Sequence, residues 1–194
     1  MSSVVDVAAD VQKRAWSVIE DADIIGCWTS VGATINLVGS LKMGLLIRNR
    51  DIDFHIYTDP FRLSDSFSAV SRLAEHQAIR SINYTNLLEA EDCIEWHAFY
   101  EDSLGDIWQI DMIHLLCESP YAGYFERVAE RICAVLTDET REAILTIKNS
   151  IPTEKRVKGI EIYRAVIEGN IRDEPSFWKW KAQQPKKELL LWVP

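Results

Sequence analysis

The chain has 194 residues and a formal net charge of −9, from 21 basic and 30 acidic side chains. Its hydrophobic content of 47% and charged content of 26% are those of a globular protein and exclude a disordered or fibrous one. The acidic balance makes tRNA, duplex DNA or another nucleic acid an unexpected partner, because binding such polyanions requires many cationic side chains.

Signals for export or membrane insertion are not apparent in the sequence. The first residues include acids and lack a long apolar run, so we expect no signal peptide. No stretch approaches the roughly 20 apolar residues of a membrane-spanning helix. The four cysteines are widely spaced and form no CxxC or zinc pattern, which is typical of reduced thiols. We therefore expect a cytoplasmic protein.

Helical and strand periodicities are mixed in the first part of the chain. Ser2 or Ser3 can cap a first helix, in which apolar residues recur at helical spacing. Asp59-Pro60 ends a strand, because proline lacks an N–H donor and the residue before it avoids the helical region. The mixture predicts an α+β fold with a mixed β-sheet flanked by helices. The predicted order is helix 4–22, connector 23–32, strand 33–38, short helix 40–47, strand 51–57, helix 64–76, strand 79–87, and a hairpin of strands 94–100 and 106–116.

After residue 118 the pattern is helical only. We therefore expect a core of residues 1–118 and a C-terminal helical region of residues 119–194. Thr137 can cap one helix, with Glu139 close enough to help, and Pro175 begins the last one. The expected helices are 121–136, 137–149, 155–168 and 175–184.

The stretch from Asp51 to Tyr57 alternates strictly between polar and apolar residues. Period two predicts a strand with one face on a core, and it puts Asp51 and Asp53 on the same face, about 6.6 Å apart. Two carboxylates brought to ~4 Å would repel by about 4 kcal/mol at an effective dielectric constant of 20. A divalent cation removes that cost, and oxygen-rich sites suit Mg²⁺. The pair is therefore a candidate metal site, and a solvated edge strand is the alternative.

A glycine turn precedes this pair. The apolar strand ends at Gly39, which lets the backbone approach a ligand closely, and Ser40 can cap a following helix whose N–H groups attract phosphate. Lys42 adds positive charge, and Gly44 permits a second turn. We predict that Gly39, Ser40 and Lys42 bind the phosphates of a nucleotide, with an ordinary turn as the alternative.

The two glycines, the serine and the carboxylate pair together resemble the signature of the DNA polymerase beta-like nucleotidyltransferase superfamily, in particular its small minimal and antibiotic-type members. The resemblance covers about residues 33–116. The chain departs from the family pattern at Lys42, where arginine is frequent, and at residues 48–50, where the family usually has a small or acidic residue before the pair. The resemblance implies a nucleotidyltransferase fold followed by a C-terminal helical bundle.

The family resemblance also implies a third aspartate on a neighbouring strand. Asp111 fits this place, since it is the one acid in the apolar stretch 107–113, where an ionised carboxylate is costly unless something pairs with it. Asp106 is the rival, but it stands in the predicted turn. His97 lies among strand residues, and we interpret it as a packed or surface histidine. The expected catalytic and metal-binding residues are Asp51, Asp53 and Asp111.

The activity that the resemblance implies is magnesium-dependent nucleotidyl transfer. Two Mg²⁺ ions, for which Mn²⁺ can substitute, would stabilise an in-line displacement on a nucleoside triphosphate, with Asp111 as the general base. A nucleoside monophosphate would pass to a hydroxyl group, and pyrophosphate would leave. The acidic, compact chain favours a small-molecule acceptor. The alternatives are an AMPylating, antitoxin-type enzyme that modifies a protein, and a non-catalytic binding module.

Four residues of the C-terminal helices are further candidates for contact with the triphosphate or the acceptor, although solvated helix faces are the favoured explanation for them: Lys148, Lys158, Tyr163 and Arg164.

Overall fold

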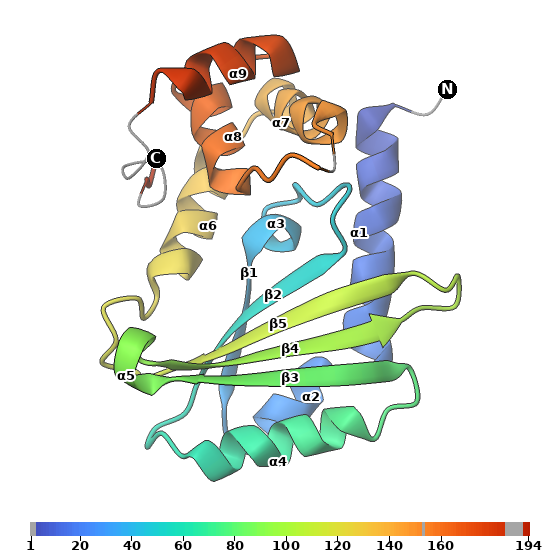
Figure 1. Ribbon diagram of the computed structural model, residues 1–194, viewed down its shortest axis with the longest axis vertical. Coiled ribbons are helices and arrows are strands. Elements are labelled where there is room, and N and C mark those ends of the chain that lie inside the picture. Colours follow the sequence, from blue (N-terminus) through green and yellow to red (C-terminus); the bar gives the residue numbers. More distant parts are fainter. Residues whose placement is uncertain (1–2, 153, 185–191) are drawn as a thin grey trace. The chain divides into compact units, whose positions relative to one another are not determined.

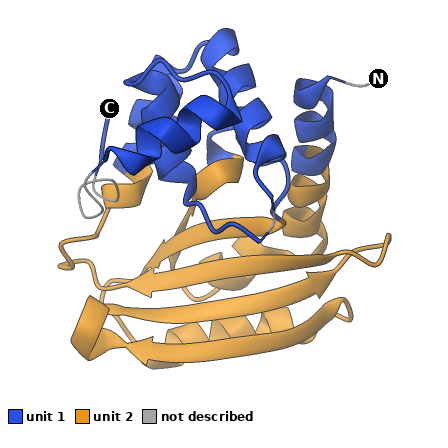
Figure 2. Cartoon of the chain, turned by 45° about the horizontal axis from the view of Figure 1, so that its top comes forward, with its two compact units in different colours: residues 1–12, 42–49, 127–194 blue, residues 13–41, 50–126 orange. Residues whose placement is uncertain are grey.

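The computed structural model describes residues 3–152, 154–184 and 192–194. The chain forms two compact units, which Figure 2 shows in different colours. The sheet unit contains Lys13–Leu41 and Arg50–Glu126, and the helical unit contains Met1–Gln12, Lys42–Asn49 and Arg127–Pro194. Both units are assembled from separate stretches of chain, whereas the expected domains 1–118 and 119–194 are contiguous. That division of domains stays a prediction.

The sheet unit is built on a five-stranded mixed sheet with the strand order β1-β2-β5-β4-β3 (Figure 1). Strands β2 and β5 pair in parallel, and all other neighbours in the sheet are antiparallel. This sheet, with helices beside it, confirms the α+β prediction. The strands are β1 (Thr34–Val38), β2 (Asp51–Tyr57), β3 (Ile79–Leu87), β4 (Cys93–Glu101) and β5 (Ile107–Leu115).

One face of the sheet is apolar and buried, because each central strand alternates between the two faces. Helices α2 (Ile24–Thr29) and α4 (Leu63–Ala74) lie on this side of the sheet (Figure 1). The indole of Trp28 in α2 donates to the sulfur of Met112 at 3.2 Å, and the indole of Trp96 donates to the hydroxyl of Ser66 in α4 at 2.7 Å. The residues of β2 and β5 on this face are at most 1% exposed: Ile52, Phe54, Ile56, Trp108, Ile110, Met112 and His114.

Short helices account for the main differences from the predicted elements. Helix α2 occupies part of the predicted connector 23–32, and α5 (Leu88–Glu91) follows β3. The predicted helix 40–47 is shortened to α3 (Gly39–Lys42), because Gly44 has a φ of +68°. One or two helical turns contain too few apolar positions to produce a helical periodicity, so the sequence pattern did not reveal α2 and α5.

The helical unit contains the start of α1 (Val4–Asp21), most of α6 (Tyr124–Val135), and all of α7 (Asp138–Ser150), α8 (Gly159–Ile167) and α9 (Glu174–Ala182). The hydroxyl of Ser3 accepts a hydrogen bond from the Asp6 amide at 3.1 Å and so caps α1, whereas Ser2 lies outside the described residues. Thr137 caps α7 as predicted, but its capping-box partner is Thr140 rather than Glu139. Among the described residues, no helix is long and apolar enough to cross a membrane.

The segment 42–49 is held within the helical unit through its backbone carbonyls. Arg141 of α7 donates to the carbonyls of Met43 and Gly44 at 2.9 and 3.0 Å, and Lys148 donates to the carbonyl of Leu45 at 2.7 Å. A Cβ atom on Gly44 would lie 2.5 Å from a guanidinium nitrogen of Arg141. The second glycine of the motif therefore gives the chain its turn and makes room for an arginine that stabilises it.

Candidate active site

The second face of the sheet carries the three predicted carboxylates. Asp51 and Asp53 lie on β2, Asp111 lies on β5, and the register pairs Asp53 with Asp111. Register partners project to the same face of a sheet, and neighbouring strands lie about 4.8 Å apart. All three residues are half-buried. The fold therefore brings carboxylates from two strands, which are 58 residues (111 − 53) and 60 residues (111 − 51) apart in the chain, to one patch of the sheet.

The glycine turn packs directly against this patch. Val38, the last residue of β1, is the register partner of Asp53, and Gly39 follows it with a φ of +66°. A Cβ atom on Gly39 would lie 2.0 Å from Oδ2 of Asp53, so a side chain at this position would displace the Asp53 carboxylate. Ser40 is the next residue and lies in α3, while Lys42 belongs to the helical unit. Phosphate binding by these residues stays a prediction.

Two side chains hold the carboxylate of Asp111 from the same face. The Nδ1 atom of His97 on β4 lies 2.6 Å from Oδ1 of Asp111, and the side-chain Nε2 atom of Gln109 donates to the same oxygen at 2.7 Å. His97 is the register partner of Asp111 across the β4–β5 pair. The sequence interpretation of His97 as a packing or surface residue missed this contact. The signal for it was the alternation of β4, which places Glu95 and His97 on one face.

The His97 imidazole is surrounded by negative charge. Its Nε2 atom lies 3.5 Å from Oε2 of Glu95, on the side of the ring away from Asp111. Burial lowers the pKa of His97, but the hydrogen bond and charge of Asp111, together with Glu95, outweigh burial, so the pKa is raised above its ordinary value. The protonated ring has a donor on each nitrogen and can serve both carboxylates.

The donor set of this patch suits magnesium. Among the described residues, no group of three or more His, Cys, Asp or Glu side chains is already arranged to hold a metal ion. Such an arrangement is not required, because Mg²⁺ usually retains several waters and takes one or two protein carboxylates together with substrate phosphates. Three carboxylates on one face supply oxygen ligands of the kind that Mg²⁺ prefers. The residues present therefore fit the metal.

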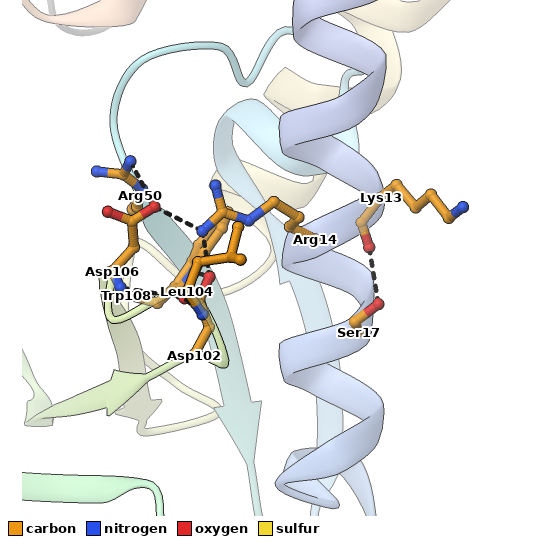
Figure 3. A network of polar contacts seen from close by, with 8 residues as sticks. All are labelled: Lys13, Arg14, Ser17, Arg50, Asp102, Leu104, Asp106 and Trp108. Carbon is orange, nitrogen blue, oxygen red and sulfur yellow. Dashed lines mark hydrogen bonds and ion pairs between the residues drawn. The ribbon is translucent and has the colours of Figure 1, made fainter.

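Asp106, the rival to Asp111, takes part in an ion-pair network at the β4–β5 turn (Figure 3). Arg14 of α1 pairs with Asp106 at 2.6 Å and also with Asp102, and Arg50 pairs with Asp106 at 2.8 Å. The indole of Trp108 donates to Asp102 at 2.9 Å. The network joins α1, the turn and Arg50, the residue that precedes Asp51. Arg50, which departs from the family pattern, therefore has a structural role.

Asp102 accepts hydrogen bonds from most of the donors in this network. Burial raises the pKa of its carboxyl group, but hydrogen bonds from Trp108, from Arg14 and from the amides of Leu104 and Asp106 outweigh burial and lower the pKa to about 2. The carboxylate is therefore charged at any pH at which the protein would be studied, and the turn is held by charge-assisted hydrogen bonds.

A second polar cluster lies further along β2 on the same face as the aspartates. The hydroxyl of Tyr57 donates to Glu126 at 2.7 Å, Nδ1 of His55 lies 3.5 Å from the other oxygen of Glu126, and the amide of Gly123 donates to the Tyr57 hydroxyl at 3.0 Å. Burial raises the pKa of Tyr57 to about 12, to which the carboxylate of Glu126 also contributes. The cluster fastens the start of α6 to β2.

The four candidates in the C-terminal helices have contacts within the helical unit. Lys148 lies 3.4 Å from the hydroxyl of Tyr163, in addition to its bond to the Leu45 carbonyl. The amide of Lys158 donates to Glu161 at 3.0 Å at the start of α8, and Arg164 pairs with Glu168 at 2.9 Å. These contacts provide structural roles, and contact with a substrate stays a prediction.

Comparisons with known proteins give similarities of structure only. No family model matches the chain, and no curated protein matches its sequence. The Cid1 poly(U) polymerase with MgGTP bound matches with a TM-score of 0.60 and 13% identity over 81% of this chain and 49% of that chain. The poly(A) polymerase of the GLD-2–GLD-3 complex matches with a TM-score of 0.56 and 11% identity, over 86% of this chain and 58% of that chain. A cytoplasmic RNA terminal U-transferase matches with a TM-score of 0.56 and 12% identity, over 84% of this chain and 50% of that chain.

These similarities establish the class of fold. The matched proteins have the fold of the DNA polymerase beta-like nucleotidyltransferase superfamily, and the present chain has that nucleotidyltransferase fold. The resemblance that the glycine and aspartate motif implied is confirmed at this level. The chain spans about half the length of the solved structures that it matches, with 49% of the Cid1 chain and 50% of the U-transferase chain covered.

Proposed function

We propose that the chain is a Mg²⁺-dependent nucleotidyltransferase, which moves a nucleoside monophosphate from a nucleoside triphosphate to a hydroxyl group. The observation that carries the proposal is the register pairing of Asp53 with Asp111, beside a glycine turn that contacts Asp53. The structures of the Cid1 poly(U) polymerase contain MgGTP or MgATP, which supports a nucleotide and Mg²⁺ as the ligands of this fold.

The residues of the patch have distinct roles in this proposal. Asp51, Asp53 and Asp111 would hold the metal ions, and the turn at Gly39 and Ser40 would hold the terminal phosphates. The metal ions would supply charge neutralisation for the attacking and leaving oxygens. A bond forms between the acceptor oxygen and the α-phosphorus, the bond from the α-phosphorus to the bridging oxygen breaks, and pyrophosphate leaves. Asp111 takes the proton of the acceptor hydroxyl.

For the acceptor we propose a small hydroxylated molecule. The net charge of −9 supports this choice, because a polyanionic acceptor would be repelled unless a local cationic surface received it. An RNA 3′ end is the second candidate, since the matched proteins are poly(U) and poly(A) polymerases and an RNA terminal U-transferase. Transfer to a protein side chain, as in AMPylating enzymes, is a further outcome that the same assay detects.

The test is a transfer assay on the full chain with each of the four α-³²P-labelled ribonucleoside triphosphates and Mg²⁺ or Mn²⁺. A mixture of sugars and aminoglycosides, a short RNA and a protein extract are offered separately as acceptors. We expect label in a small molecule and release of pyrophosphate. Label in the RNA or in a protein would contradict the small-molecule acceptor but would still support nucleotidyl transfer. If calorimetry detected no metal-dependent nucleotide binding, the proposed reaction would be contradicted and a non-catalytic binding module would be favoured.

Asp51→Asn tests the site itself, and Asp10→Asn is its matched control, because Asp10 is exposed on α1. We expect Asp51→Asn to lower turnover by at least about 100-fold, the size of effect seen when a transition-state contact is removed. The melting temperature should stay close to that of the wild type. Asp10→Asn should keep full turnover. Wild-type turnover in Asp51→Asn would remove the assignment.

A further inference from the structure

Asp111 is held by two donors that converge on a single carboxylate oxygen. His97 reaches Oδ1 from β4 at 2.6 Å, and Gln109 reaches the same oxygen from β5 at 2.7 Å. A carboxylate has two oxygens, so this arrangement uses one of them and leaves Oδ2 as the atom that a ligand can take. The orientation of Asp111 is therefore set by its neighbours on the sheet.

The contact with His97 is supported by the backbone register. His97 and Asp111 are direct partners across the antiparallel β4–β5 pair, which places their side chains next to each other on one face. Their side chains are 27% and 20% exposed, so the hydrogen bond is partly shielded from water. Glu95 lies 3.5 Å from the other ring nitrogen and limits rotation of the imidazole. A ring held at both nitrogens is a rigid donor.

We propose that His97 is a positioning residue for the reaction, which acts by fixing the Asp111 carboxylate so that Oδ2 faces the metal ion and the acceptor hydroxyl. The inference rests on the proposed function, because it assigns Asp111 to that chemistry. Groups that orient a metal-binding carboxylate typically change metal affinity or activity by about 10–100-fold when removed. Gln109 also fixes the Asp111 carboxylate, since its side chain donates to the same oxygen.

Three variants separate the hydrogen bond from simple packing. His97→Ala removes the donor. His97→Asn retains one, because the amide nitrogen of asparagine is attached to Cγ, as Nδ1 is in histidine. Asn83→Ala is the matched control, since Asn83 is the register partner of His97 on β3 and is exposed. If His97→Ala does not fold, Gln109→Leu removes the second donor to Oδ1 and serves in its place.

Two measurements on the full chain do not depend on turnover. The first is the dissociation constant of Mn²⁺ alone, measured by electron paramagnetic resonance. We expect His97→Ala to weaken Mn²⁺ binding by about 10–100-fold, and His97→Asn and Asn83→Ala to remain within about threefold of the wild type. The second is the position of Asp111 in metal-free crystal structures, where we expect its carboxylate to rotate in His97→Ala and to stay in place in His97→Asn.

With an active enzyme, the same variants give a kinetic test. We expect kcat to fall by about 10–100-fold in His97→Ala, with the KM for the triphosphate changed less, and to be largely restored in His97→Asn. An unchanged Asp111 and unchanged Mn²⁺ affinity in His97→Ala would overturn the proposal, as would a His97→Asn variant as impaired as His97→Ala.

The outcomes distinguish this inference from the proposed function. A wild-type chain that binds Mn²⁺ but transfers no nucleotide would contradict the function, and the Mn²⁺ affinities of the variants would still decide the role of His97. A wild-type chain that binds no Mn²⁺ would also contradict the function. In that case an unmoved Asp111 in the His97→Ala structure overturns the positioning role, and a rotated one supports it.

Discussion

Gly39 and the carboxylate of Asp53 are in direct contact, since a Cβ atom on Gly39 would lie 2.0 Å from Oδ2 of Asp53. Gly39 directly follows Val38, the last residue of β1, and Val38 is the register partner of Asp53 on the neighbouring strand β2. The contact is therefore a consequence of the sheet register. It explains why the turn from β1 into α3 requires glycine for space as well as for its φ of +66°.

Substituting this glycine should damage both stability and activity. Gly39→Ala places a methyl group on a left-handed residue, which costs about 1–2 kcal/mol, and forces Asp53 away. Gly105→Ala is the matched control, because Gly105 has a φ of +79° but nothing within 4 Å of its Cβ position. We expect both variants to lose stability in urea unfolding, Gly39→Ala more so, and only Gly39→Ala to lose Mn²⁺ binding and nucleotidyl transfer. Equal effects of the two substitutions would contradict the contact.

The ion-pair network at the β4–β5 turn should contribute measurably to stability. Arg14→Met removes the cation shared by Asp102 and Asp106 and leaves Asp102, whose side chain is 11% exposed, without its guanidinium partner. We expect the free energy of unfolding to fall by about 1–3 kcal/mol, the cost of leaving a partly buried charged acceptor with fewer donors. Asp106 is less affected, because Arg50 still pairs with it.

The neighbouring residue supplies the control for this prediction. Lys13 is exposed and points away from the network in Figure 3. Lys13→Met should change the free energy of unfolding by less than about 0.5 kcal/mol. If urea unfolding gives the same loss for both variants, the loss comes from the helix surface and the network is not a source of stability.

His114 should make the fold sensitive to mild acid. Its side chain is 0% exposed, and burial lowers its pKa to about 4, against 6.5 for an ordinary imidazole. Between those pH values the unfolded chain binds a proton that the folded chain does not, so stability falls as the pH falls through this window. At about 1.4 kcal/mol for each pKa unit, the contribution approaches about 3 kcal/mol.

Urea unfolding from pH 7 to pH 4.5 checks this expectation. His114→Gln retains a polar group that can reach the hydroxyl of Thr58, which lies 3.0 Å from Nε2 of His114. The variant has no imidazole to titrate, so its stability should depend less on pH than that of the wild type. Parallel pH profiles for the two proteins would show that His114 does not account for the acid sensitivity.

The turn at Met43 and Gly44 should depend on Arg141. Arg141→Met removes donors from the carbonyls of Met43 and Gly44, which accept at 2.9 and 3.0 Å. Buried acceptors without partners cost about 1–3 kcal/mol each, so we expect a loss of this size or larger in urea unfolding. Arg131→Met is the control, because Arg131 is exposed on α6. A loss no greater than that of the control would mean that water replaces the guanidinium.

The sequence predicted the sheet well where a strand has one buried face. The alternation of Asp51–Tyr57 identified β2 with its observed ends, and it placed Asp51 and Asp53 on the face opposite Ile52 and Phe54. The apolar surroundings of Asp111 likewise singled it out before its register with Asp53 was known. Period two is a local property of the chain, so these residues could be predicted without knowledge of strand order.

The sequence could not predict features that depend on which strands become neighbours. The contact of His97 with Asp111 requires the β4–β5 register, and the role of Arg141 requires that α7 meets residues almost 100 positions earlier, at sequence separations of 98 and 97. Polar residues at such positions look like ordinary surface residues in the sequence. The prediction of a connector at residues 23–32 was wrong for a different reason. Helix α2 has only six residues, which are too few to show a helical period.

The division of the chain into its two units has a consequence for protein engineering. The chain passes between the units at residues 12–13, 41–42, 49–50 and 126–127, so neither unit is one uninterrupted segment. A fragment ending at residue 118 would lose Arg141 and Lys148, the donors to the carbonyls of residues 43–45, while retaining the hydrophobic side chains of that loop. Isolating the β-sheet therefore calls for splicing Leu41 to Arg50 with a short artificial linker, and simple truncation would yield an aggregation-prone fragment.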